Sequence, residues 1–276
     1  MVYSYPQNID IYQHGILIED DEIPASLSRI ATTKLPIYSS FNLAIIDANG
    51  QSLNQTGAGL ASVSEARFRS DYDEEYDLRY CVLSTLYHLN RLIDLYVLNC
   101  QQFEKRHPKG TAIRGNLHIP NAYYEVDAFL TSARRIYDSV SKVLWKHYYK
   151  NSKGRWRSIR SAVKSLDRVP PDFADILKTS WTTIGEPLTN YRDCVVHYVP
   201  LTNGIETGWM DFYEDRWGMT VKLPTNPTSK SRSGFDFASG PDALTYCHDT
   251  TTKLMKLCTD LMALKEISEY LNNPPR

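Results

Sequence analysis

Apolar residues recur every three or four positions over most of the chain after residue 70, which is the period of a helix with one buried face. The longest stripes predict helices over residues 75–103 and 122–149. Shorter stripes predict two helices between residues 172 and 200 and a last helix from about 242 to 271. Long helices with short connections are typical of an antiparallel bundle, so the chain is expected to be mainly α-helical.

Proline and glycine residues predict where the shorter helices begin and end. A short apolar stripe ends at Pro170, and Asp172 is positioned to cap the helix that follows. Gly185 is expected to interrupt that helix, and Pro187 suits the first turn of a further one. This further helix must end before Pro200, because the residue before a proline disfavours helical backbone.

Two regions depart from the helical pattern. Residues 1–70 carry short apolar runs among Pro, Gly, Ser and Asn, which indicates an irregular, partly β N-terminal appendage. Residues 207–223 alternate between apolar and polar side chains, and residues 224–241 are rich in turn-forming residues. This pattern predicts a small β-hairpin and a loop, inserted at about 201–241 before the last helix. The rest of 71–276 is assigned to the helical bundle.

The composition is that of an ordinary globular protein. Of 276 residues, 42% are apolar and 23% are charged, with a net charge of −1. The five cysteines lack CxxC spacing and are expected to be reduced thiols, as in a cytoplasmic protein. We expect neither a signal peptide nor a membrane-spanning segment. No zinc-ligand spacing, glycine-rich phosphate loop or serine-hydrolase motif occurs, so no metal and no cofactor are expected.

The candidate chemistry lies in the short helix that ends before Pro200. At 100° per residue, one side of this helix is polar and faces away from the apolar side, and it carries Arg192, Asp193 and His197. Asp193 and His197 are four residues apart, so the carboxylate is expected to orient the imidazole and to favour its charged form. The negative end of the helix dipole acts in the same direction on His197. The fork of donors on Arg192 suits a phosphate.

The segment from Arg192 to His197, which reads Arg-Asp-Cys-Val-Val-His, resembles the R-x(4–6)-H signature of HEPN domains. Residues 127–135 also resemble a helix of several HEPN subfamilies. This resemblance implies a helical bundle that forms a homodimer, with two Arg–His helices facing each other across a cleft. It further implies metal-independent RNA cleavage, in which His197 activates the ribose 2′-hydroxyl, Arg192 stabilises the phosphate, and a 2′,3′-cyclic phosphate is left.

A basic stretch precedes this helix. Residues 142–168 contain nine basic residues and one acidic residue, a net charge of +8, and four aromatic residues are interleaved with them. Basic side chains hold phosphates and aromatic faces stack on unpaired bases, so an RNA-binding track is one interpretation. A solvated helix–loop–helix surface is the alternative. The residues expected to bind RNA are Lys146, Lys150, Lys153, Arg155, Arg157 and Arg160.

Three hypotheses about function follow. The first is an endoribonuclease of HEPN type that acts as a homodimer, in the context of a toxin or a phage-defence effector. The second is a non-catalytic helical module that binds RNA, a nucleotide, or a protein partner such as a nucleotidyltransferase antitoxin. The third is a structural dimer subunit that binds no ligand. RNA cleavage by the purified protein separates the first hypothesis from the other two.

Overall fold

The structure is a computed structural model of the chain. It describes residues 73–107, 119–150, 158–202, 208–213, 216–229 and 231–267, together with Trp156 and the short strands at 12–13, 16–17 and 115–116. Most of these residues are helical, and a small antiparallel sheet accompanies them. The prediction of a mainly helical protein is therefore confirmed. No helix that the structure describes combines the length and apolar content needed to cross a membrane.

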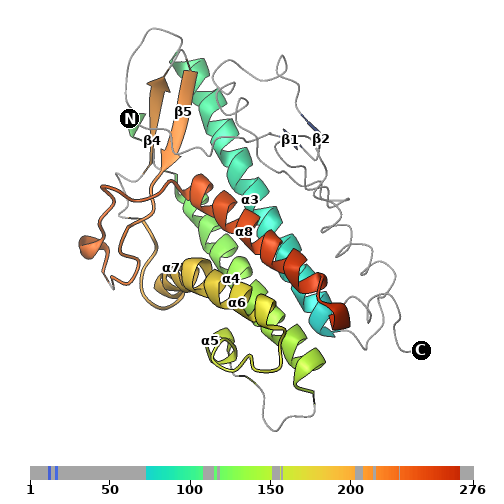
Figure 1. Ribbon diagram of the computed structural model, residues 1–276. Helices are drawn as coiled ribbons and strands as arrows, with labels where there is room; N and C mark the ends of the chain where they lie inside the picture. The colour runs from blue at the N-terminus through green and yellow to red at the C-terminus, as the bar shows by residue number, and fades with distance from the viewer. Residues whose placement is uncertain are drawn as a thin grey trace.

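Two long helices form the centre of the molecule. Helix α3 (Asp73–Arg106) packs along α4 (Pro120–Tyr148), and α8 (Ala243–Met262) lies against both (Figure 1). Every residue of the predicted apolar stripes of α3 and α4 that the structure describes is buried, with Leu89, Tyr96 and Phe129 0% exposed. Burial of these stripes against one another is the main source of stability, since removal of apolar surface from water drives folding.

A second group of helices packs on the first. It consists of α5 (Ile159–Ala162), α6 (Pro171–Ser180), a π-helix (Trp181–Gly185) and α7 (Glu186–His197). Helix α7 lies on α4, and α6 contacts α8 (Figure 1). Their buried residues belong to the same apolar cluster as those of α3, α4 and α8, so the described helices share one core.

The predicted hairpin is present. Strands β4 (Gly208–Tyr213) and β5 (Arg216–Val221) pair antiparallel, and β3 (Gly115–Asn116) adds to β4 in the order β3-β4-β5. The pair Met210 and Met219 faces the core, and both residues are 0% exposed. The appendage at 1–70 is described only at β1 (Tyr12–Gln13) and β2 (Ile16–Leu17), which pair antiparallel; the rest of it lies outside the described residues.

Three expectations about helix boundaries are wrong. The last helix was expected to run to about residue 271, but α8 ends at Met262. The N-cap of α6 is Pro170, and Asp172 lies within the first turn and does not cap the helix. Gly185 does not interrupt the helix, because the backbone continues into α7 through the π-helix. A Cβ atom at position 185 would overlap the ring of Trp181 and lie 3.0 Å from Cζ of Tyr137. The glycine therefore permits a close approach between this turn and α4 and does not act as a helix breaker.

The buried carboxylate of Asp242 joins three elements. Its Oδ1 accepts hydrogen bonds from the Tyr96 hydroxyl of α3 at 2.7 Å and from the Val221 backbone N–H of β5 at 2.9 Å. Its Oδ2 accepts from the backbone N–H of Thr245 at 3.1 Å, which caps the first turn of α8. Burial raises the pKa of the Asp242 carboxyl to about 6. This single side chain connects the hairpin to the helical core.

We predict that Asp242→Ala lowers the free energy of unfolding by about 3–5 kcal/mol, because three donors would lose their acceptor inside the protein. Urea unfolding of both proteins at neutral pH measures the difference. The matched control is Asp175→Ala, whose carboxylate is 79% exposed and 3.7 Å from Lys178, so a change of about 0.5 kcal/mol or less is expected. Equal losses in the two variants would contradict the role given to Asp242.

Candidate functional site

Helix α7 is fixed to the molecule on three sides. The Tyr191 hydroxyl donates a hydrogen bond to the backbone carbonyl of Pro224 at 2.7 Å. The ring of Tyr191 also packs edge-on against Tyr246 of α8, with ring centroids 5.0 Å apart. On the α4 side, Nε of Arg134 donates to Oγ1 of Thr189 at 2.8 Å. The orientation of α7 is therefore set by α4, α8 and the inserted segment before α8.

Cys194 lies within the Arg192–His197 segment but is not part of its outward surface. Its side chain is buried, and its thiol donates a hydrogen bond to the backbone carbonyl of Val199 at 3.5 Å. Burial raises the pKa of the Cys194 thiol, which keeps it protonated and makes it a poor nucleophile. All five cysteines of the chain are buried and free of disulfide bonds.

The polar side of α7 faces outward, as predicted. The side chains of Arg192 and Asp193 are 34% and 43% exposed, and they form an ion pair in which Nη1 donates to Oδ1 at 2.7 Å. His197 is exposed and is the last residue of the helix. The helix closes immediately after it, because the Tyr198 backbone N–H bonds to the Cys194 carbonyl. The structure thus places a cation, a carboxylate and an imidazole on the outward surface of one short helix.

The partner of Asp193 differs from the expected one. The carboxylate pairs with Arg192, and no hydrogen bond joins Asp193 to His197 in the part of the chain that the structure describes. A guanidinium is charged at every accessible pH and offers several donors, so it competes effectively for a carboxylate. Asp193 therefore orients Arg192, and the imidazole of His197 stays open to solvent.

Arg134 has a structural role. Its side chain is 14% exposed and forms an ion pair with Asp138 at 2.9 Å, in addition to its bond to Thr189. Its guanidinium carbon also lies 5.3 Å from the centroid of the Trp181 ring. These contacts join α4 to the π-helix and to α7, and they leave little of Arg134 for a ligand.

Asp127 of α4 is a candidate functional residue, although the sequence pattern assigned no role to it. Its Oδ1 is buried and has no hydrogen-bond partner in the structure, and its charge is near enough to raise the pKa of the Cys194 thiol. Burial raises the pKa of the Asp127 carboxyl to about 7. A carboxyl that titrates near neutral pH is unusual and is found more often at functional sites than elsewhere. The only signal in the sequence is that Asp127 adjoins Val126, a residue of the buried stripe.

The structure places three of the six residues expected to bind RNA. Lys146 is half-buried near the end of α4, and Lys150 and Arg160 are exposed. Arg160 lies 3.9 Å from Glu186 at the start of α7, a contact too long and too exposed to neutralise it fully. The other three lie outside the described residues: Lys153, Arg155 and Arg157.

The aromatic residues of the basic stretch pack largely on one another. Tyr149 is 5% exposed, stacks on Trp145 with centroids 5.4 Å apart, and contacts Trp156 at 4.7 Å. The Tyr148 hydroxyl donates to Glu266 at 2.7 Å. Tyr149 is therefore not available for stacking on a base, whereas Trp156 is half-buried and lines a surface cavity.

Lys146, at the end of α4, lies far along that helix from the outward surface of α7, whereas Arg160 lies beside Glu186 at the start of α7. Helices α4 and α7 run antiparallel. Arg134 of α4 contacts Thr189 of α7, whereas Asp127, earlier in α4, lies near Cys194, later in α7. Lys146 follows Asp127 by 19 residues of the chain, which corresponds to about 28 Å along the helix axis. A strand that touched both Lys146 and the outward surface of α7 would have to run along most of α4 (Figure 1).

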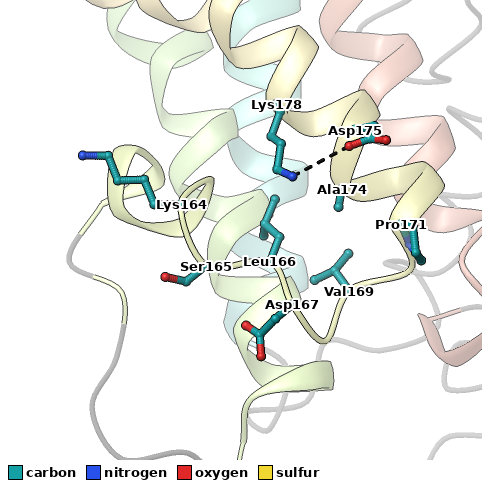
Figure 2. A pocket seen from close by; sticks show the side chains of 9 residues that line it. All are labelled: Lys164, Ser165, Leu166, Asp167, Val169, Pro171, Ala174, Asp175 and Lys178. Carbon is teal, nitrogen blue, oxygen red and sulfur yellow. Dashed lines mark ion pairs between the residues drawn. The ribbon is translucent and has the colours of Figure 1, made fainter.

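A cavity of about 480 Å³ opens between α6 and the segment that joins α5 to α6 (Figure 2). Its floor is apolar, and Lys178 extends over it toward Asp175, whereas the ammonium group of Lys164 extends away from the other labelled side chains. The cavity holds no cluster of converging polar groups. Within the described residues, no group of three or more His, Cys, Asp or Glu side chains is arranged to hold a metal ion.

We predict that Asp127→Asn removes part of the pH dependence of stability. The folded-state pKa of Asp127 is raised to about 7 from an ordinary value of 3.8, so between these values the unfolded chain releases a proton that the folded chain keeps. The stabilisation from this group is therefore complete below about pH 4 and is lost as the pH rises to 7.

Urea unfolding at pH 4.5 and pH 8 measures the effect. Asp127→Asn should gain stability relative to the wild type as the pH rises, whereas the exposed control Asp175→Asn should not. A difference between Asp127→Asn and the wild type that is the same at both pH values would show that the carboxyl titrates normally.

Comparison of the chain with protein-family models, with curated proteins and with solved structures finds no significant match to any of them.

Proposed function

We propose that the protein is a metal-independent endoribonuclease of HEPN type that acts as a homodimer. The observation that supports this most strongly is the outward placement of Arg192 and His197 on a short helix whose other sides are fixed to the core. The spacing from Arg192 to His197 is that of the R-x(4–6)-H signature. The substrate in this proposal is single-stranded RNA.

In the proposed reaction, the neutral imidazole of His197 takes the proton of a ribose 2′-hydroxyl. The 2′-oxygen attacks the adjacent phosphorus, and the bond from phosphorus to the 5′-oxygen breaks. The departing oxygen takes a proton from the His197 of the second protomer, which leaves a 2′,3′-cyclic phosphate and a free 5′-hydroxyl. Arg192 stabilises the charge that develops on the phosphate oxygens. Asp193 holds the guanidinium of Arg192 in place and is a positioning residue.

The exposed apolar surface beside His197 supports contact with a second copy of the chain. Val196 is 47% exposed and Tyr198 is 51% exposed, and they flank His197 in the sequence. Large apolar side chains that are exposed beside a candidate site often become covered in an interface. A dimer formed there would bring two His197 side chains to one cleft. A toxin or phage-defence effector of this kind would need a neutralising or activating partner.

We predict that His197→Ala and Arg192→Ala each reduce RNA cleavage by about 100-fold or more, because one removes the acid–base group and the other removes the charge stabilisation. Cleavage of a 5′-labelled RNA, with detection of the 2′,3′-cyclic phosphate end, measures the change. EDTA should leave the wild-type rate unchanged.

The matched control is His88→Ala. His88 lies on α3 and pairs with Glu125 of α4 at 2.8 Å, so it is not part of the outward surface of α7 and cleavage should continue at the wild-type rate. A strict requirement for added Mg²⁺, or equal activity of His197→Ala and the wild type, would refute the proposed mechanism.

A second prediction concerns the dimer. Val196→Glu should shift the solution mass from dimer toward monomer and reduce cleavage, while thermal stability changes little because the side chain is already half-exposed. Ile176→Glu is the control, since Ile176 is 38% exposed on α6 and should leave the mass unchanged. Sedimentation velocity distinguishes the two states. A wild-type protein that is monomeric at assay concentration would exclude the composite site.

The ion pair between Arg192 and Asp193 gives some support to a second candidate function. Because a carboxylate already occupies the guanidinium, the same surface suits a non-catalytic module that binds RNA, a nucleotide or a protein partner such as a nucleotidyltransferase antitoxin. RNA that binds to the wild type but is never cut would favour this candidate over the ribonuclease.

A further inference from the structure

A second cavity lies on the side of the bundle, where α3 and α4 meet the start of α5. Its volume is about 320 Å³, within the usual range for a small-molecule site. The lining combines two cations with an indole ring and hydroxyl groups, from Arg135, Lys142, Trp156, Ser141 and Ser158. These are the groups that recognise a nucleotide: cations and hydroxyls for the phosphate and ribose, and an aromatic face for the base.

The charges around this cavity single out one cation. Two carboxylates also line the cavity, and each already has a cation as its partner. Asp77 pairs with Nζ of Lys142 at 2.7 Å, and Asp138 pairs with Arg134 at 2.9 Å. Arg135 is exposed, with its guanidinium 5.7 Å from the centroid of the Tyr80 ring. Among the described residues no carboxylate forms an ion pair with Arg135. Within the part of the chain that the structure describes, its guanidinium can therefore accept an anion without first breaking an ion pair.

The indole of Trp156 is held in a fixed position. It packs edge-on against Trp145, with centroids 5.1 Å apart and planes at 77°, and it also contacts Tyr149. The side chain is only half-buried, and it reaches the cavity. An aromatic ring that is already immobilised loses little entropy when a base stacks on it.

The cavity belongs in part to the basic stretch, because Lys142, Trp156 and Ser158 line it, and along α4 it lies between Lys146 and Asp127, the residue near Cys194 of α7. Arg135 follows Asp127 by eight residues and precedes Lys146 by eleven, which corresponds to about 12 Å and about 16 Å along α4. At 100° per residue, the four positions 127, 135, 142 and 146 fall within about 100° of one another on the helix. An RNA strand covers such distances in about four to five stacked nucleotides at about 3.4 Å each.

We propose that this cavity is a nucleotide subsite for an RNA strand, in which one unpaired base lies on Trp156 and an adjoining phosphate binds Arg135. This inference rests on the proposed ribonuclease function. In it, the cavity binds a part of the RNA substrate that is several nucleotides from the bond that is cleaved. Lys146 and Lys150 extend the contact on one side, and Arg192 and His197 lie on the other. The subsite is a binding site and takes no part in the chemistry.

The test uses an RNA oligonucleotide with 2′-O-methyl groups throughout, which can bind but cannot be cleaved by attack of a 2′-hydroxyl. Fluorescence anisotropy of the full-length protein should show about tenfold weaker binding for Arg135→Glu than for the wild type. The slope of the logarithm of the association constant against the logarithm of the salt concentration should become less steep by about one, because one phosphate contact is lost. Trp156→Phe, which preserves an aromatic ring in the cluster, should weaken binding by a smaller factor.

Two controls keep the result specific. Lys253→Glu reverses an exposed charge on α8 and should change affinity by less than about twofold, so a loss as large as that of Arg135→Glu would indicate only a general charge effect. An oligonucleotide with 5-iodouracil should crosslink to Trp156 under ultraviolet light, and mass spectrometry identifies the residue. Arg135→Glu with unchanged affinity, or crosslinks that avoid Trp156, would overturn the subsite.

Further measurements separate this inference from the proposed function. Binding that depends on Arg135 in a protein that never cleaves RNA would uphold the subsite and refute the ribonuclease. Cleavage that depends on His197 with no effect of Arg135→Glu on affinity would do the reverse. Tryptophan fluorescence can be titrated with a mononucleotide and with the oligonucleotide. If both quench it at the same concentration, the cavity binds a free nucleotide and the assignment to an RNA strand is overturned.

Discussion

The buried carboxylate of Asp242 is the contact on which the arrangement of the other elements depends. It holds the Tyr96 hydroxyl of α3, the backbone of β5 and the first turn of α8 at one point. The chain between β5 and α8 then supplies the Pro224 carbonyl that holds Tyr191. The position of α7 therefore depends indirectly on this polar contact, which lies one helical turn from Tyr246, the residue of α8 that packs against Tyr191.

The candidate site is a surface of one helix, and its reactive groups are not enclosed. Arg192 and Asp193 are partly exposed, and His197 is exposed. Groups in water are weak catalysts, because a high dielectric reduces every electrostatic interaction. Activity at such a surface requires a second surface to cover it, which is why the homodimer belongs to the proposed mechanism and why the apolar residues beside His197 are part of the same proposal.

Helical periodicity predicted the helices and most of the core, because burial of one stripe imposes a spacing of three and four residues along the chain. It also predicted that His197 faces away from the core. It could not predict the partner of Asp193, because neighbouring positions on a helix allow either Arg192 or His197 and the choice depends on side-chain conformation. Nor could periodicity predict the raised pKa of Asp127, because the desolvation of a side chain depends on which residues of other elements pack against it, here those of α7. The basic stretch was visible as composition, but the packing of Tyr149 beneath its neighbours was not.

The π-helix between α6 and α7 has a geometric consequence. A wide turn holds one residue more than a regular turn of α-helix, so it sets the rotation of α7 relative to α6. Without that extra residue, every later position of α7 would be displaced by about 100° around the axis. Arg192 and His197 would leave the side of the molecule that they now share, although each would keep its place in the sequence. The direction in which the polar surface faces is thus set in the π-helix, which ends at Gly185, seven residues before Arg192.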